Sequence, residues 1–417
     1  MLPILLGQIL SLGVGVAGVR LASSLVAPAD YGIYGLFVSL TPLGAAVIYA
    51  GLVKYVARHW HETTDRQALK SATLTAAMRK APWLVIAAAL TAAALPGRWL
   101  GLFPALLVAA SALGLLAFVQ TALQADRANW RDFGVSLTGS LLRTLLPLAL
   151  YALVGGKLQW LLVGFALYAV LTAAIAMGVG GWGSAWRTPR TTEVITTYDG
   201  PRFVVLAAVG WAMGASGRAI VAGFFGAAEA GYFVLAGNVA LVVVSTLYAV
   251  VLQFFQPRLF AYAEETSGDI KVLTQITDLV AIGFTLLGVA GVVVLRALMP
   301  WLVGTLIAPQ YADAANWLLA AGSFHLALLV PMFFHLLLIA ARRESACGPA
   351  EIGTAIVLLA GGVGAAALSA DTFRWFAMAS PVVAWLVARP IAIWSLHRSR
   401  NRRADSAATP PSADLPL

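Results

Sequence analysis

The stretch that decides the fold runs from Arg20 to Tyr34 and reads RLASSLVAPADYGIY. It places an arginine inside a long apolar run, eight residues before Pro28, and then gives an acidic residue and a glycine. Residues 218–232, RAIVAGFFGAAEAGY, repeat this order, with the arginine eight residues before Gly226. The same pattern in two distant places indicates a chain built from two similar halves.

Composition assigns both halves to a membrane. The chain of 417 residues is 60% hydrophobic and 11% charged, with a mean hydropathy of +0.86, whereas an ordinary soluble domain is about 25% charged. Apolar stretches of the roughly 20 residues needed to cross a bilayer recur from end to end. The sequence therefore predicts an all-α polytopic membrane protein. Its one cysteine, Cys347, excludes an intrachain disulfide and a multi-cysteine metal site.

Proline, glycine and charged clusters cut the chain into about twelve predicted spans. They are 4–26, 32–53, 82–96, 100–123, 133–154, 158–179, 203–225, 231–255, 278–299, 315–340, 351–370 and 375–396. We expect two parallel six-helix lobes. The predicted divisions are an N-terminal lobe at 1–180, a cytoplasmic linker at 181–202, a C-terminal lobe at 203–396 and a basic, disordered cytoplasmic tail at 397–417.

Loop charges predict the orientation. If the N-terminus lies in the cytoplasm, nearly every loop lysine and arginine falls inside, and only Arg98, Lys157 and Arg374 fall outside. This asymmetry satisfies the positive-inside rule and places both termini in the cytoplasm. The outer connections are short, which argues against a membrane glycosyltransferase or polymerase with a large outer domain. Asp30, in the first outer turn, is expected to be solvated or to cap the following helix.

Five arginines fall within the predicted spans. Arg296 and Arg389 lie near span ends, where their side chains can reach the headgroups. Arg20, Arg143 and Arg218 lie deeper, where an arginine costs at least about 2.5–3.5 kcal/mol. The spans offer almost no carboxylate to pair with them, so a cationic cavity for an anionic substrate is predicted. The alternative is that each guanidinium binds backbone carbonyls or packs between helices.

Other candidate sites are weaker. Lys54 and Arg58, just below the second span, could attract an anionic headgroup, or could be ordinary inside charge. His325 and His335 do not share a helical face, and we expect them to be lone packing residues. The sequence shows no metal-ligand cluster, and Tyr151 stands where a P-loop before Lys157 would need glycine. No metal, cofactor or nucleic-acid partner is therefore expected.

Parallel repeats related by an axis along the membrane normal are a transporter design, with the substrate site between the halves. Several motifs of this chain resemble those of polysaccharide biosynthesis flippases of the O-antigen translocase type, within the MOP (multidrug, oligosaccharidyl-lipid, polysaccharide) exporter superfamily. The motifs are Gln8-Ile-Leu-Ser-Leu12, Arg20-Leu-Ala22, Pro28-Ala-Asp-Tyr-Gly-Ile-Tyr34, Gly226-Ala-Ala-Glu-Ala-Gly-Tyr232, Gln256-Pro-Arg-Leu259 and Pro309-Gln-Tyr-Ala-Asp-Ala314.

The resemblance implies a flippase that moves a polyprenyl-(pyro)phosphate-linked oligosaccharide from the cytoplasmic to the outer leaflet of the bacterial inner membrane. Its expected partners are membrane lipids and, in polysaccharide assembly, a polymerase and glycosyltransferases. Arg143 and Arg218, helped by Arg20, would hold the anionic group during alternating access. Family members often carry an acid just before the seventh-span arginine, where this chain has Gly217. The absence of that acid leaves Arg218 without an acidic partner at this position and favours anion binding.

Alternatives come from three classes: other transporters, enzymes and scaffolds. A drug or small-molecule antiporter of the same superfamily would carry acidic residues inside the lobes, and a peptidoglycan-precursor flippase would usually be longer. A membrane-embedded glycosyltransferase or polymerase would be an enzyme with a long outer loop bearing carboxylates. A scaffold for a polysaccharide assembly complex is the remaining, non-transporting possibility. We expect a transporter and no covalent chemistry.

Overall fold

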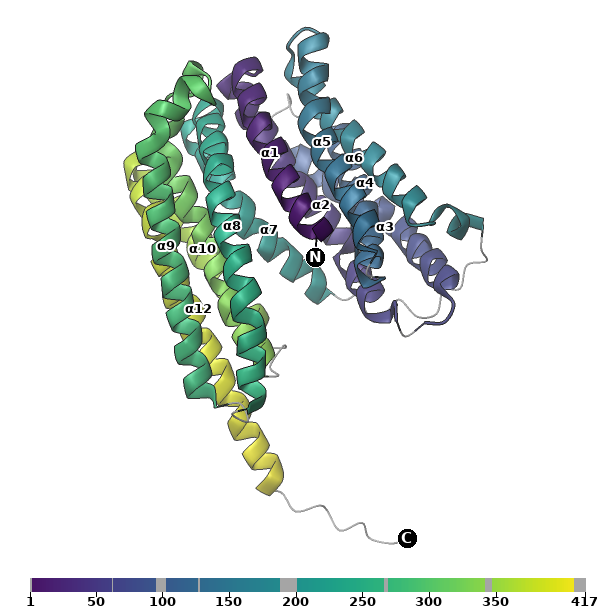
Figure 1. Ribbon diagram of the computed structural model, residues 1–417, viewed down its shortest axis with the longest axis vertical. Helices are drawn as coiled ribbons and strands as arrows, with labels where there is room; N and C mark the ends of the chain where they lie inside the picture. The colour runs from purple at the N-terminus through teal and green to yellow at the C-terminus, as the bar shows by residue number, and fades with distance from the viewer. Residues whose placement is uncertain are drawn as a thin grey trace. The chain divides into compact units, whose positions relative to one another are not determined.

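The computed structural model describes residues 2–61, 63–94, 103–126, 128–187, 201–265, 269–341 and 347–408. Over these ranges the chain forms twelve α-helices and two short 3-10 helices (Figure 1). They are α1 Leu2–Leu25, α2 Pro28–His59, α3 Arg66–Ala94, α4 Phe103–Ala125, α5 Asn129–Leu153, α6 Leu158–Val179, η2 Gly183–Arg187, α7 Pro201–Phe225, α8 Ala227–Glu265, α9 Ile270–Thr305, η4 Pro309–Tyr311, α10 Ala314–Ala340, α11 Cys347–Leu368 and α12 Ala370–Ala408.

Each predicted span corresponds to one of these helices, and the largest differences are at two ends. Helix α3 begins at Arg66 rather than at residue 82, because its polar first half consists mostly of good helix formers such as Arg, Gln, Ala and Lys. Helix α12 continues to Ala408, so its last turns lie in the 397–417 segment that was expected to be disordered.

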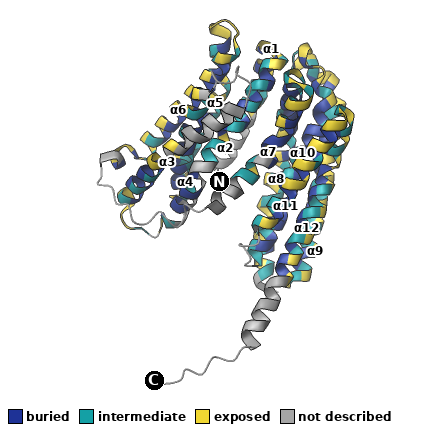
Figure 2. Ribbon diagram, turned by 180° about the vertical axis from the view of Figure 1, so that it is seen from behind, coloured by how far each residue is buried: buried dark blue, intermediate teal, exposed yellow. Residues whose placement is uncertain are grey.

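The surface of the helices is that of a membrane protein. Within the described residues, eight helices are long and apolar enough to cross a bilayer, and Gly13–Leu25 is a shorter apolar helix. Many large apolar side chains are exposed, among them Leu279, Leu286 and Trp301, with 65–73% of their surface accessible. Exposed residues alternate with buried ones along the helices (Figure 2). Lipid is the solvent that such a surface requires.

The two sequence repeats form the same local structure. Helix α1 ends at Leu25 and α2 begins at Pro28, whose fixed φ suits the first position of a helix. Helix α7 ends at Phe225 and α8 begins at Ala227, and Gly226 between them has φ of +93°. Only glycine adopts this left-handed conformation at little cost. Both repeats are therefore pairs of helices joined by a very short break.

The chain divides into two compact units. The first comprises residues 1–239 and 298–317, and thus α1 to α7, the start of α8 and the connection from α9 to α10. Within it α2 packs against α3, α4 and α7, while α6 packs against α4 and α5, and α1 against α5. Its core contains the fully buried rings of Trp60, Phe118, Phe165 and Trp182.

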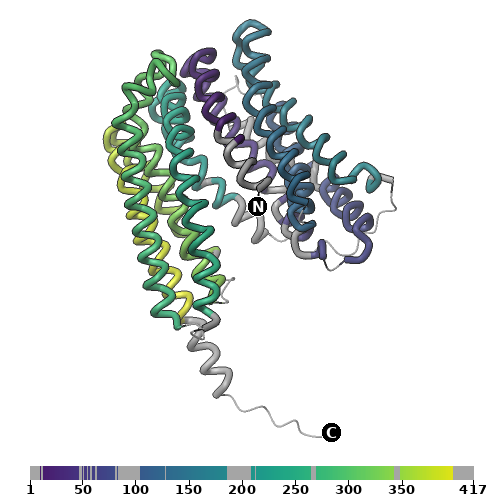
Figure 3. The backbone as a smooth tube through the Cα atoms, viewed as in Figure 1, coloured from purple at the N-terminus to yellow at the C-terminus, as the bar shows by residue number. Residues whose placement is uncertain are grey.

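The second unit comprises residues 240–297 and 318–417. It contains most of α8 and α9, the rest of α10, and α11 packed against α12. Phe284 and Phe333 are buried at its centre with ring centroids 5.1 Å apart, and Tyr248 contacts both rings. The course of the chain through each unit can be followed in Figure 3. The predicted lobe boundaries at 180 and 203 remain a prediction.

Candidate functional site

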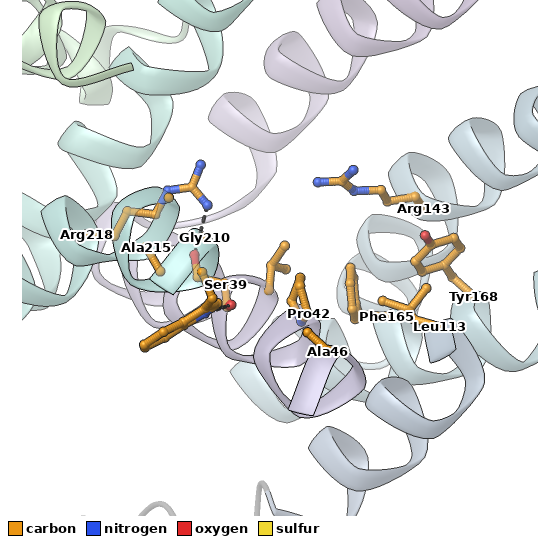
Figure 4. A pocket seen from close by; sticks show the side chains of 13 residues that line it. Ser39, Pro42, Ala46, Leu113, Arg143, Phe165, Tyr168, Gly210, Ala215 and Arg218 are labelled. Atoms are coloured by element: carbon orange, nitrogen blue, oxygen red, sulfur yellow. Dashed lines mark hydrogen bonds between the residues drawn. The ribbon is translucent and has the colours of Figure 1, made fainter. Parts of the chain in front are cut away.

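The first unit contains a cavity of about 470 Å³ (Figure 4). Helices α2, α4, α5, α6 and α7 contribute its walls. Two of the three deep arginines predicted from the sequence, Arg143 and Arg218, line it. The described lining residues are Val38, Ser39, Pro42, Ala46, Leu113, Arg143, Phe165, Tyr168, Gly210, Trp211, Gly214, Ala215 and Arg218, and none of them is an aspartate or glutamate.

Arg218 reaches the cavity from α7. Trp211, Gly214, Ala215 and Arg218 follow the spacing of one helical face, so a single stripe of α7 supplies all four. The Arg218 Nη1 donates a hydrogen bond of 2.9 Å to the Ser39 Oγ of α2. The small residues of this stripe leave room in front of the guanidinium.

Arg143 reaches the same cavity from α5, and its guanidinium points toward the space opposite Arg218 (Figure 4). Phe165 and Tyr168 of α6 stand beside it and form an aromatic wall. Among the residues that the structure describes, no carboxylate forms an ion pair with Arg143 or Arg218. The cavity therefore carries two positive charges that a ligand could neutralise.

The other predicted site residues are placed differently. Arg20 is an exposed residue of α1 and does not line this cavity, although its sequence pattern matches that of Arg218. The side chains of Lys54 and Arg58 lie outside the described residues. The part of Arg20 in substrate binding, and that of the two inner basic residues, remains a prediction.

The connection between α9 and α10 is hydrogen-bonded to the break between α1 and α2, a contact that the sequence did not predict. Tyr311 donates a hydrogen bond of 3.0 Å to the Val26 carbonyl oxygen, and Gln310 donates one of 2.6 Å to the Ser23 carbonyl oxygen. These bonds satisfy carbonyls that the end of α1 leaves without helical partners. The motif at 309–314 thus forms a cap for α1.

Helices α2 and α8 cross where the two repeats place their glycines. A Cβ atom at Gly32 would lie 2.0 Å from the Ala227 carbonyl oxygen and 2.7 Å from the Gly231 nitrogen. A Cβ atom at Gly231 would lie 1.9 Å from the Pro28 carbonyl oxygen. We call this contact of Gly32 with Gly231 the glycine crossing. It requires glycine on both helices because the facing atoms belong to the backbone.

The acidic residues of both repeats accept hydrogen bonds from aromatic side chains. The Tyr151 hydroxyl donates to Asp30 Oδ2 over 3.2 Å, and the Trp317 indole donates to Glu229 Oε2 over 2.6 Å. The N-cap of α2 is Ala27. Asp30 therefore does not cap α2, and α5 supplies this half-exposed carboxylate with a partner.

Two polar side-chain contacts in the second unit also correct the sequence-based interpretation. The Arg389 Nε donates to both carboxylate oxygens of Asp278, at 2.8 and 3.0 Å, so this arginine is ion-paired. His335 is bonded to Glu351 and is not a lone packing histidine. Each pair joins two different helices, α9 with α12 and α10 with α11, which explains why inspection of single spans did not reveal them.

Comparison with known proteins identifies the fold. No protein-family model and no curated protein sequence matches the chain. A multidrug resistance MATE family transporter of the MOP superfamily, solved in an inward-facing conformation, is similar in structure over 97% of this chain and 96% of its own, with a TM-score of 0.62 and 14% identity. The lipid II flippase MurJ, in an inward closed conformation, is similar over 95% of this chain and 87% of its own, with a TM-score of 0.63 and 12% identity.

A third structure, the MATE transporter VcmN of Vibrio cholerae, is similar over 97% of this chain and 95% of its own, with a TM-score of 0.54 and 13% identity. At these identities the likeness shows the fold. The chain has the fold of MOP-superfamily transporters and flippases, and the prediction of an all-α, multi-pass membrane protein of about twelve helices is confirmed.

Proposed function

We propose that this protein is a flippase for a polyprenyl-(pyro)phosphate-linked oligosaccharide, which it moves from the cytoplasmic to the outer leaflet during synthesis of an O-antigen, capsule or exopolysaccharide. The observation that carries the proposal is the pair Arg143 and Arg218, which line one cavity with no carboxylate among its described lining residues. The fold shared with a lipid II flippase supports a lipid-linked substrate.

The chemistry of the cavity suits a phosphate or pyrophosphate. A guanidinium presents paired N–H donors that match two oxygens of one phosphate. Two guanidinium groups that share a cavity repel each other, and a multiply charged anion removes that repulsion when it binds. Phe165, Tyr168 and Trp211 add flat, mostly apolar surfaces against which sugar rings can pack. The prenyl chain would remain in the bilayer.

The second candidate is a drug or small-molecule antiporter, which the MATE structures favour. The charged residues among the described lining are both arginines. Their positive charges would repel a cationic drug from the cavity. A membrane-embedded glycosyltransferase or polymerase is less favoured, because the structures of similar fold are transporters and flippases. Proteoliposomes offered ethidium in place of the glycolipid separate these possibilities, because an antiporter would transport the dye and a flippase for an anionic glycolipid would not.

In this proposal the protein lies in the bacterial inner membrane with both termini in the cytoplasm. Alternating access moves the anionic group past the cavity, with Arg20 as a third contact. Lys54 and Arg58 attract the headgroup from the cytoplasmic side. A polysaccharide polymerase and glycosyltransferases are the expected partners, since they produce and consume the lipid-linked glycan. The chain itself makes and breaks no covalent bond.

The test is transport in proteoliposomes that contain a fluorescent undecaprenyl-pyrophosphate oligosaccharide, with exposure measured by lectin access. Arg143→Ala and Arg218→Ala should each slow exposure at least about tenfold, since a hydrogen-bonded charge contributes about 1.5–3 kcal/mol. Arg296→Ala is the matched control, because Arg296 belongs to the second unit and does not line the cavity. Normal exposure by the double variant at equal protein content would overturn the proposal.

A further inference from the structure

Ser39 of α2 accepts hydrogen bonds from two residues of α7 through two different atoms. Its Oγ accepts the hydrogen bond from Arg218, and its carbonyl oxygen accepts one from the Trp211 indole. Pro42 follows one turn later inside α2 and has no N–H to donate, so the helical hydrogen-bond ladder is interrupted beside Ser39. Both contacts come from the stripe of α7 that lines the cavity.

The Ser39 hydroxyl is oriented by α2 itself. It donates its own hydrogen to the Gly35 carbonyl oxygen over 2.7 Å, which turns its lone pairs toward the Arg218 Nη1 at 2.9 Å. A serine hydroxyl has one hydrogen to donate, so in this arrangement it acts toward Arg218 only as an acceptor. Ser39 is also buried, with 8% of its surface exposed. The guanidinium is therefore held by a fixed, neutral group.

The second unit provides a contrast within the same chain. There Arg389 is held by Asp278, whose carboxylate cancels the charge of the arginine. In the cavity a neutral hydroxyl occupies the corresponding role, so Arg218 is positioned and still keeps its full charge for a ligand. A carboxylate at this contact would cancel one of the two positive charges of the cavity, whereas the hydroxyl leaves both.

We infer that Ser39 is the positioning residue of the anion site, and that its neutrality sets the preference of the cavity for anions over cations. This inference rests on the proposed function, because it assigns a part in binding the anionic group that Arg143 and Arg218 receive. Ser39 acts through Arg218, and it need not touch the substrate.

The decisive test compares the Ser39→Asn and Ser39→Asp variants, because the introduced side chains have nearly the same size and differ in charge. The full chain in nanodiscs is titrated with farnesyl pyrophosphate, and the dissociation constant is measured. A carboxylate beside Arg218 removes one of the two positive charges of the cavity, so Ser39→Asp should bind at least about tenfold more weakly than Ser39→Asn. Equal constants for the two variants would overturn the inference.

Two further variants test positioning. Ser39→Ala should bind at least about tenfold more weakly than the natural protein, the effect of one lost hydrogen bond to a charged group, and Ser39→Thr should restore binding. In an Arg218→Ala background, Ser39→Ala should change nothing further, because its effect passes through Arg218. Full effect of Ser39→Ala in that background would contradict the assigned role.

Thr41→Val is the matched control for loss of a buried hydroxyl from α2. Thr41 donates to the Phe37 carbonyl oxygen over 2.9 Å, the same kind of bond within the helix that Ser39 makes, and it does not line the cavity. Its variant should bind farnesyl pyrophosphate as the natural protein does. Failure of the natural protein to bind this probe would overturn the proposed function itself, which keeps that outcome distinct from equal binding by the Asn and Asp variants.

Discussion

Replacement of Gly32 by alanine should separate α2 from α8 at the glycine crossing. The added Cβ would lie 2.0 Å from the Ala227 carbonyl oxygen, whereas ordinary van der Waals contact begins at 3.4 Å. The two helices must therefore move apart by about 1.4 Å, the difference between these distances. Because the facing atoms are backbone, no side-chain rotation can relieve the collision.

The magnitude follows from two opposing contributions. Overpacking costs about 1–3 kcal/mol, and a collision with backbone belongs at the upper end of that range. Alanine gains about 1 kcal/mol over glycine inside a helix. We therefore expect Gly32→Ala to lower the free energy of unfolding by about 2 kcal/mol in SDS titrations followed by circular dichroism. Gly134→Ala in α5 is the control, because no described atom lies within 4 Å of a Cβ there.

The double variant Gly32→Ala/Gly231→Ala gives a sharper test. Both added methyl groups enter the same crossing, so the separation forced by the first already accommodates most of the second. The loss for the double variant should stay close to the larger single loss and well below the sum. Strict additivity, or a Gly32→Ala stability equal to that of the Gly134→Ala control, would refute the account of the crossing.

Three other predictions concern contacts away from the cavity. Arg389→Ala should lower the free energy of unfolding by about 1.5–3 kcal/mol because it leaves Asp278 without its charged partner, and adding Asp278→Asn should recover part of the loss in a thermal unfolding series. Burial lowers the pKa of Lys70 below its ordinary 10.5. Between the lowered pKa and 10.5 the unfolded chain therefore binds more protons than the folded chain, and the free energy of unfolding should rise with pH. Denaturation of the Lys70→Met variant over the same pH interval should not show this rise. Tyr311→Phe should remove the bond to the Val26 carbonyl oxygen and cost about 1 kcal/mol, seen as faster amide exchange at the end of α1.

Much of the helical architecture could be predicted from the sequence. Where proline, glycine or charge bounds an apolar run of about 20 residues, both ends of the helix can be predicted. The predicted 158–179 span agrees with α6, Leu158–Val179. The first half of α3 was missed because hydrophobicity predicts the part of a helix that crosses the bilayer. This segment is helical but too polar to be predicted in that way. The short breaks at Pro28 and Gly226 were visible because proline and glycine constrain the backbone locally.

The candidate site was only partly predictable. Arg143 and Arg218 were singled out because a charge deep within a span is costly, and depth within a span can be estimated from the sequence. Arg20 satisfies the same criterion and the same repeat pattern, yet the structure leaves it outside the cavity that Arg218 lines. Ser39 carried no signal, because a serine in a helix becomes informative only when its partner is known.

The sequence by itself determined the class of the protein, the number of its helices, their breaks and the excess of deep positive charge. These properties depend on a residue and its near neighbours along the chain. Only the tertiary structure decided that Asp278 neutralises Arg389 while Ser39 leaves Arg218 charged, because the partners come from helices far apart in sequence. Neighbours in space therefore decide which arginine is paired with a carboxylate and which is bonded to a neutral hydroxyl.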